Sequence, residues 1–256
     1  MILIDTHTHL YLENFSEDRN EVIENAINQG VDLMLLPAID ISSFDSMKEL
    51  STTFPNNCLP MIGLHPTSVK DDYEKEMQLV EDQLAAGGYI AVGEIGIDLY
   101  WDKTHFEQQK DAFRRQLKLA KKYHLPVAIH TRDSFDEIYP IVVDELTEEL
   151  TGVFHCFTGS AEEAKKVMDI GFLMGIGGII TFKNSELSEV VQTIPVEYLL
   201  LETDAPFLTP APFRGKRNQS AYITYIANKL AEVKGVSNNY IAEITTHNAN
   251  KLFKLI

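Results

Sequence analysis

Short apolar runs alternate along this chain with longer segments in which apolar residues recur every three or four positions. The runs are rich in β-branched residues and almost continuously apolar. Such runs are typical of parallel strands that helices cover on both faces. The expected strands are 2–5, 31–37, 59–63, 90–94, 127–130, 152–155, 172–175 and 198–202.

The longer segments have the period of helices, and their ends carry capping signals. Ser16 and Ser160 are the predicted N-caps of two of them, and Gly171 ends the second. The expected helices are 17–29, 42–51, 73–86, 106–123, 135–146, 161–170, 184–193, 221–234 and 238–255. Eight strand–helix alternations predict an α/β protein, a single-domain (β/α)8 TIM barrel spanning 1–256. An open doubly wound sheet is the alternative, because alternation alone does not prove closure.

Composition narrows the classes of protein to consider. The chain is 45% hydrophobic and 23% charged, as in globular proteins, and no run approaches the roughly 18 apolar residues that span a bilayer. Two cysteines, Cys58 and Cys156, are too few for a disulfide framework, so a reducing compartment is expected. The net charge of -16 argues against a nucleic-acid coat or an anionic-membrane binder. It leaves open an enzyme that handles phosphates through metals and local basic residues.

Residues of metal-ligand type follow almost every expected strand. In a barrel, the carboxyl ends of all strands meet at one face, where active sites are built. Residues far apart in the sequence are therefore expected to lie together in one site at this face. They are His7, His9, His65, Glu94, His130, His155, Glu202 and Asp204.

The chemistry of this set points to a divalent cation. His7 and His9 lie two apart, so both imidazoles face the same way and can reach one ion. A lone histidine at a strand end is more often a hydrogen-bonded structural residue, so the combined pattern carries the inference. Mixed imidazole and carboxylate ligands suit Zn²⁺, Mn²⁺ or a similar ion. There are enough ligands for two metals bridged by Glu94, which would activate a shared water for displacement at phosphorus or carbon.

Basic residues are expected at the same face. Arg132 follows His130 by two positions, Lys183 follows the seventh strand, and the RGKR segment 214–217 follows the eighth. The segment is either a solvated basic turn or an anion site. In so acidic a chain we favour an anion site, because arginine can hold phosphate oxygens bidentately.

With these motifs in hand, the chain resembles the TatD family of metal-dependent deoxyribonucleases, within the amidohydrolase-like barrels. The matching segments run in the family's order along nearly the whole chain. They are DTHTHL (5–10), GLHP (63–66), GEIGID (93–98), HTRD (130–133), HCFTGS (155–160), TFKN (181–184), ETDAPFLTP (202–210) and RGKRN (214–218).

The resemblance implies a role for each matching residue. One metal is held by His7, His9, Glu94 and Asp204, and the second by Glu94, His130 and His155. Asp204 and Glu94 are the implied catalytic residues, with Asp204 orienting or deprotonating the attacking water. The substrate-binding residues at the scissile phosphate are His65, Arg132 and Arg214.

The resemblance also implies an activity. It is cleavage of phosphodiester bonds in DNA by a two-metal activated water, as a 3′ to 5′ exonuclease on single strands. Mg²⁺ or Mn²⁺ is the implied activating ion, and Zn²⁺ is a further occupant of such a site. DNA, with RNA as an alternative, is the expected substrate. The resemblance also implies a cytoplasmic location. No membrane and no obligate protein partner is expected.

Two departures and one extra residue leave questions open. Thr67 stands where the family commonly has a second histidine, and Gln219-Ser220 replaces a common Glu-Pro. Trp101 either packs against the protein or stacks on a base of the substrate.

The same water chemistry would also serve another ester or amide, such as a D-aminoacyl-tRNA ester, a lactone or a phosphotriester. Glu94, where many such relatives carry a carboxylated lysine, favours phosphodiesters. A non-catalytic barrel would be expected to lack some of the six ligands.

Overall fold

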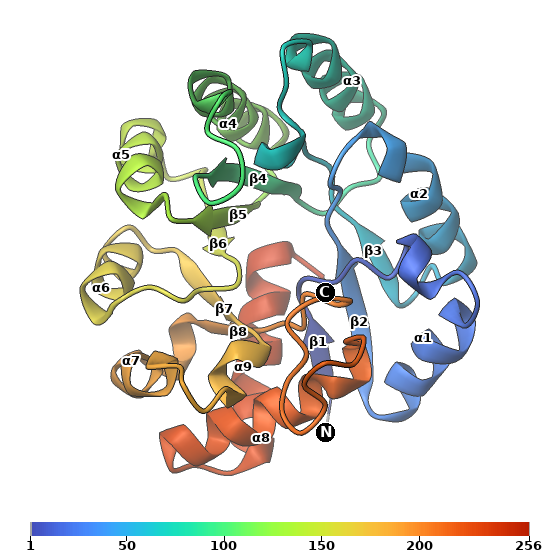
Figure 1. Ribbon diagram of the computed structural model, residues 1–256, viewed down its shortest axis with the longest axis vertical. Coiled ribbons are helices and arrows are strands. Elements are labelled where there is room, and N and C mark those ends of the chain that lie inside the picture. Colours follow the sequence, from blue (N-terminus) through green and yellow to red (C-terminus); the bar gives the residue numbers. More distant parts are fainter. Residues whose placement is uncertain (1, 256) are drawn as a thin grey trace.

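The strands form a closed ring of parallel neighbours in the computed structural model, which describes residues 2–255 (Figure 1). Hydrogen-bonded ladders join β1 to β2 and β3, and join β4 through β8 in order. Parallel bridges between Ile62 and Val92 and between Thr8 and Ala205 close the two gaps. The strands are β1 (Leu3–Asp5), β2 (Val31–Leu36), β3 (Cys58–Pro60), β4 (Val92–Asp98), β5 (Val127–Arg132), β6 (Gly152–Phe154), β7 (Leu173–Ile176) and β8 (Leu199–Leu201). The barrel prediction is confirmed, and the open-sheet alternative is wrong.

Most of the helices lie outside the strands, as the apolar stripes predicted (Figure 1). They are α1 (Arg19–Asn28), α2 (Phe44–Thr53), α3 (Tyr73–Ala86), α4 (Phe106–Tyr123), α5 (Phe135–Glu145), α6 (Ala161–Asp169), α7 (Leu187–Thr193), α8 (Ile223–Lys234) and α9 (Asn238–Phe253). Ser160 caps α6 as predicted and forms a capping box with Glu163. Ser16 was wrong as a cap: α1 begins at Arg19, after Asp18. None of the helices in residues 2–255 is long and apolar enough to cross a membrane.

Helix α9 closes the amino-terminal end of the barrel. In Figure 1 it lies behind the strands rather than in the outer ring of helices. Its Ala249 and Phe253 pack against the inward-facing side chains of the strands, including Ile4, Leu35 and Leu200. The amide of Asn248 donates to the backbone oxygens of Val196 and Leu199 and fixes the helix there. This end of the interior is therefore apolar and filled, so a polar site can open only at the carboxyl-terminal end.

The interior changes from apolar to polar along each strand. In β5, Ala128 lies in the apolar interior, and His130 follows two positions later on the same face. In the segment that leads into β4, Ala91 and Glu94 are three positions apart, so regular alternation would put them on opposite faces. The β4–β5 register is irregular between Val92 and Ile95, and this irregularity brings both side chains inside.

Candidate metal centre

Glu94 lies at the centre of the histidines and the aspartate that the sequence singled out. Its Oε2 atom is 3.1 Å from His7 Nε2 and 3.6 Å from His9 Nε2. Its Oε1 atom is 2.7 Å from His130 Nδ1 and 2.8 Å from His155 Nε2. The two oxygens of one buried carboxylate therefore face two different pairs of imidazoles. This is the geometry expected of a bridge between two cation positions.

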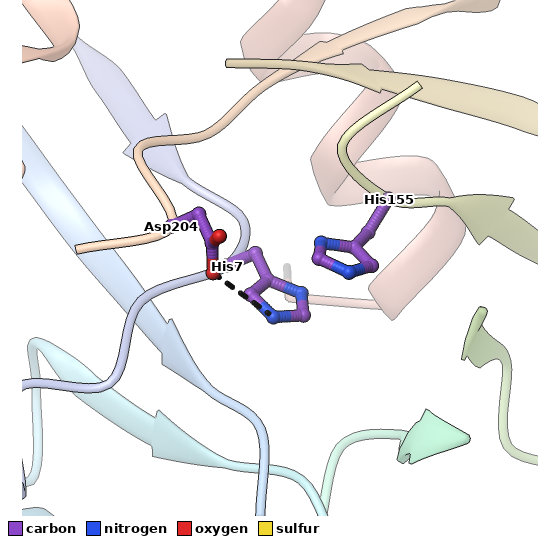
Figure 2. A group of neighbouring side chains, drawn as sticks. All are labelled: His7, His155 and Asp204. Carbon is purple, nitrogen blue, oxygen red and sulfur yellow. Dashed lines mark ion pairs between the residues drawn. The ribbon is translucent and has the colours of Figure 1, made fainter. Parts of the chain in front are cut away.

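Asp204 completes the pair formed by His7 and His9. Its Oδ1 atom is 3.4 Å from His9 Nε2 and 3.9 Å from His7 Nε2. In Figure 2 the His7 ring lies between the Asp204 carboxylate and the His155 ring, which stacks on it with centroids 3.8 Å apart. The backbone N–H of Asp204 donates to the carbonyl of His7, so the loop after β8 is tied to the loop after β1. All six predicted ligands are brought together.

Around His7 and His9 the distances fit a cation between the side chains better than direct hydrogen bonds, whereas the 2.7 and 2.8 Å contacts of Glu94 Oε1 with His130 and His155 have hydrogen-bond lengths. Two atoms that each lie about 2.1 Å from a tetrahedral ion are about 3.4 Å apart. The four separations around His7 and His9 range from 3.1 to 3.9 Å, and most are too long for a hydrogen bond. Within residues 2–255, three groups of side chains place their ligand atoms close enough to hold an ion: His7, His155 and Asp204; His7, His9 and Glu94; and His65, Glu94 and His130.

A hydrogen bond behind the His9 ring determines which of its two nitrogens faces the centre. The Tyr11 hydroxyl donates to the Pro37 carbonyl at 2.7 Å, so it accepts from His9 Nδ1 at 3.0 Å. That bond places the proton of His9 on Nδ1 and leaves Nε2 bare toward Glu94 and Asp204. A bare nitrogen facing carboxylate oxygens is repulsive unless a cation lies between them. The residues present therefore fit a divalent metal.

His130 is oriented in the same way by Asp98. The Asp98 carboxylate lies 2.9 Å from His130 Nε2 and accepts its proton, which turns Nδ1 toward Glu94. Carboxylates that hold the far nitrogen of a ligand histidine fix its tautomer and raise its basicity. Sequence reasoning missed Asp98 and Tyr11. The available signal was their spacing: Asp98 is on the same strand as Glu94, four positions on, and Tyr11 follows His9 by two.

His65 is within ligand distance, but its hydrogen bonds favour a different role. Its Nε2 atom lies 3.3 Å from Glu94 Oε1. The backbone N–H of Thr67 donates to His65 Nδ1 at 3.2 Å, which places the ring proton of neutral His65 on Nε2. His65 is thus set to donate a hydrogen bond into the site, in keeping with its predicted contact with substrate. Thr67, one of the departures from the family pattern, takes part in setting that tautomer.

Burial and the neighbouring charges shift the pKa values of the clustered residues in different directions. Burial alone would raise the pKa of Glu94, but the surrounding imidazoles, led by His155, hold it well below its usual range. Burial opposes a charge on His155, but Glu94 and Glu202 outweigh it and hold its pKa well above the usual value. The pKa of His7 is lowered, by burial and by the nearby His155. In the metal-free protein, protons on some of the imidazoles therefore balance the carboxylates.

Glu202 lies inside the barrel behind His155. Its Oε1 atom accepts from the backbone N–H of Cys156 at 2.5 Å and is 3.5 Å from His155 Nδ1. A Cβ atom on Gly175 would come within 2.1 Å of Glu202 Oε2, so only glycine leaves room for this carboxylate. Glu202 therefore supports His155 from behind.

A cavity of about 550 Å³ opens over the centre, and the basic residues lie around it unequally. Arg132 lines the cavity, and among residues 2–255 it has no carboxylate within 4 Å. Arg214 is exposed outside the lining, with its guanidinium 3.7 Å from the Phe182 ring centroid. Arg217 pairs with Asp18 at 2.5 Å. Within the RGKR segment, Arg217 thus attaches its loop to the start of α1. Arg132, at the end of β5, is the cation among the residues that line the cavity.

Comparison with known proteins places this arrangement in a family. The model for TatD related DNase matches residues 4–254. The chain belongs to the TatD family. The uncharacterized metal-dependent hydrolase YabD of Bacillus subtilis is 40% identical over 99% of this chain and 100% of its own length. The metal-dependent hydrolase YcfH of Escherichia coli is 34% identical over 100% of this chain and 97% of its own. The crystal structure of YjjV, a TatD homologue from the same organism, superimposes with a TM-score of 0.93 at 30% identity and covers 98% of both chains.

Proposed function

We propose that this TatD-family protein is a divalent-metal-dependent hydrolase that cleaves phosphodiester bonds in DNA, from the 3′ end of single strands. The observation that carries the proposal is the Glu94 carboxylate, whose two oxygens face two separate pairs of imidazoles. The description of the family as TatD related DNase supports cleavage of DNA, and the relatives' names support metal-dependent hydrolysis.

Each side chain has a role that follows from its position. Two divalent cations, Mg²⁺ or Mn²⁺ in the active protein, would lower the pKa of a water and offset negative charge that develops on the phosphoryl oxygens. His7, His9, Glu94 and Asp204 would hold one, and Glu94, His130 and His155 the other. His65 Nε2–H and the Arg132 guanidinium bind and orient the phosphoryl oxygens.

Asp204 is the best placed of the clustered carboxylates to take a proton from water. Its side chain is 14% exposed to the cavity, against 4% for Glu94. Burial would raise the pKa of Asp204, but His9 and its neighbours lower it, so the carboxylate is ionised and can accept a proton. As the water oxygen bonds to phosphorus, its proton passes to Asp204, and the bond to the departing nucleotide oxygen breaks. That oxygen then takes up a proton.

The substrate must carry a negative group with which the Arg132 guanidinium can pair. The net charge of -16 would repel a polyanion over most of the surface, so binding depends on Arg132 and the cations. This supports contact with a few phosphates at a strand end rather than a long nucleic-acid footprint. The RGKR segment follows β8, and its exposed Arg214 adds positive charge to the loop that carries Thr209.

The test is release of nucleotides from end-labelled single-stranded DNA by metal-depleted protein to which Mn²⁺ or Mg²⁺ is returned. We expect cleavage only with the ion, and immediate release of a 3′ label with slower shortening of a 5′-labelled strand. His130→Ala should abolish it, and His247→Ala, on an exposed position of α9, should not. Equal activity in the two variants would reveal a contaminating nuclease.

A panel of other esters separates this proposal from its alternative. The same side chains would serve acyl hydrolysis, because that reaction needs the same activated water. The panel contains a D-aminoacyl-tRNA ester, a lactone and a phosphotriester. Hydrolysis of any of these, with no cleavage of phosphodiesters, would contradict the proposal and reassign the centre to that ester.

A further inference from the structure

Two exposed aromatic rings stand on opposite sides of the cavity that lies over the candidate metal centre. Trp101 is 68% exposed and Phe207 is 49% exposed, and both line the cavity. Trp101 follows β4 and Phe207 follows β8. These strands are four places apart in a closed ring of eight, so their carboxyl ends lie across the barrel from each other (Figure 1). Large apolar side chains left exposed at a cavity mouth mark a binding surface.

The Trp101 side of the mouth is held in register with the centre by Asp98. One oxygen of Asp98 accepts from the backbone N–H groups of Tyr100 and Trp101, both at 3.0 Å. The other oxygen is 2.9 Å from His130 Nε2. A single buried carboxylate thus fixes both the aromatic turn and an imidazole of the centre.

Arg132 belongs to the same wall. Its guanidinium carbon lies 3.8 Å from the Tyr100 ring centroid and 5.3 Å from that of Trp101. Stacking on Tyr100 orients the guanidinium and leaves its N–H groups unpaired with any carboxylate of residues 2–255. A cation for a phosphate and a flat ring for a base therefore lie side by side.

On the opposite side of the cavity, backbone hydrogen bonds fix the position of Phe207 relative to the centre. The backbone N–H of Phe207 donates to the carbonyl of Asp204 at 2.8 Å, and the amide of Asn218 donates to the carbonyl of Phe207 at 2.6 Å. The Phe207 ring centroid lies 6.2 Å from that of His9. The second ring is thus attached to the residues at the opposite edge of the centre.

We propose that Trp101 and Phe207 are base-stacking faces that hold the unpaired nucleobases on either side of the phosphate bound at the centre. The proposal rests on the proposed function and specifies its substrate: a strand whose bases are unstacked, independent of sequence, because every base offers a π-face. In duplex DNA the bases stack on one another and cannot occupy these faces, so frayed ends and single strands are preferred.

Trp101 is the only tryptophan in the chain, so intrinsic tryptophan fluorescence reports on this face directly. The probe is a short single-stranded oligothymidylate with cleavage-resistant phosphorothioate linkages, added to the metal-loaded protein. We expect saturable quenching. An abasic strand of equal length and charge should quench little and bind roughly ten-fold more weakly. Equal binding and quenching by the abasic strand, or no quenching by either, would overturn the proposal.

Variants and cleavage assays separate this inference from the proposed function. Phe207→Ala should weaken oligothymidylate binding roughly ten-fold, and Trp101→Ala should raise KM by a similar factor with little change in kcat. Trp101→Phe should restore most of the loss. Tyr240→Ala, at an exposed ring on α9, is the matched control. Cleavage of the normal and abasic phosphodiester strands with equal KM would overturn the stacking faces and leave the hydrolase intact. Quenching without cleavage of any strand would contradict the proposed hydrolysis and leave the stacking faces intact.

Discussion

The same strands form both ends of the barrel interior, but one end is filled with apolar side chains and the other with charged and polar ones. At the amino-terminal end, side chains such as Ile4, Leu35 and Leu200 close around Ala249 and Phe253 of α9. At the carboxyl-terminal end, imidazoles and carboxylates crowd together at separations of 2.7 to 3.9 Å. One end gains stability from apolar burial. The other keeps buried charges together, which costs stability unless cations or protons lie among them.

The backbone beside the candidate centre includes residues in unfavourable conformations. Asp204 and Cys156 both have left-handed backbone conformations, with φ values of 55° and 46°. Such conformations persist only where surrounding contacts over-determine them, and both residues border the candidate centre. The apolar end therefore supports the polar end, and changes at the two ends should have separable effects.

Glu94→Gln should have the largest effect. It removes the charge that faces both pairs of imidazoles, and we expect phosphodiester hydrolysis to fall about a thousand-fold. Bound metal should fall as well, whereas the thermal midpoint of the metal-free protein should not drop. Retention of both the metal and the activity would break the assignment of Glu94 as the bridge.

Phe253→Ala addresses the other end. Removing a buried ring that packs inside the barrel should lower the free energy of unfolding by about 3–5 kcal/mol. At temperatures where the variant is folded, metal content and kcat should remain close to those of the parent protein. Chemical denaturation and metal analysis of one sample provide both readouts, and a loss of metal from folded protein would show that the ends are coupled.

Asp98→Asn should have an intermediate effect. An amide in place of the carboxylate that accepts from His130 Nε2 should weaken metal binding about 10- to 100-fold. The Asn218 side chain provides a useful contrast, because it is equally buried but bonds only backbone groups. Its Nδ2 donates to the carbonyls of Thr203 and Phe207, and its Oδ1 accepts from the backbone N–H of Gln219. Asn218→Asp should therefore act on stability first. Unchanged metal affinity in Asp98→Asn would remove Asp98 from the support of the centre.

The smallest predicted effect is a pH dependence of metal uptake. Against the effect of burial, Glu94 and Glu202 hold the pKa of His155 well above its usual value, so this ring is protonated in the metal-free protein. Metal binding needs a neutral imidazole, so each cation must displace the proton. Affinity should weaken about ten-fold for each unit that the pH falls, per proton displaced. Calorimetry in buffers of different ionisation enthalpy would measure the released proton, and a pH-independent affinity would contradict this account.

Much of the arrangement could be predicted from the sequence because it depends on short patterns. Strand-like runs and helical periods are local, and the carboxyl ends of parallel strands must converge, so His7, Glu94, His130 and Asp204 could be placed together without coordinates. The start of α1 was wrong because residues 13–15 form a 3-10 helix, Ser16 follows it as its C-cap, and the α-helix begins only at Arg19. The helical period alone does not distinguish the end of one short helix from the start of the next.

The roles of the supporting residues could not be predicted for a similar reason. Which nitrogen of His9 carries the proton depends on Tyr11 and on the carbonyl of Pro37. That His65 donates rather than accepts depends on the backbone of Thr67. The sequence pattern predicts which side chains meet, and the hydrogen bonds behind them determine what each can do when they meet.

The central claim is that two divalent ions share Glu94. Anomalous diffraction from crystals grown with Mn²⁺ tests it most directly. The account predicts two peaks about 3.5–4 Å apart, one beside His7, His9 and Asp204, the other beside His130 and His155, with Glu94 bound to both. A single peak, or two peaks that do not share Glu94, would contradict it.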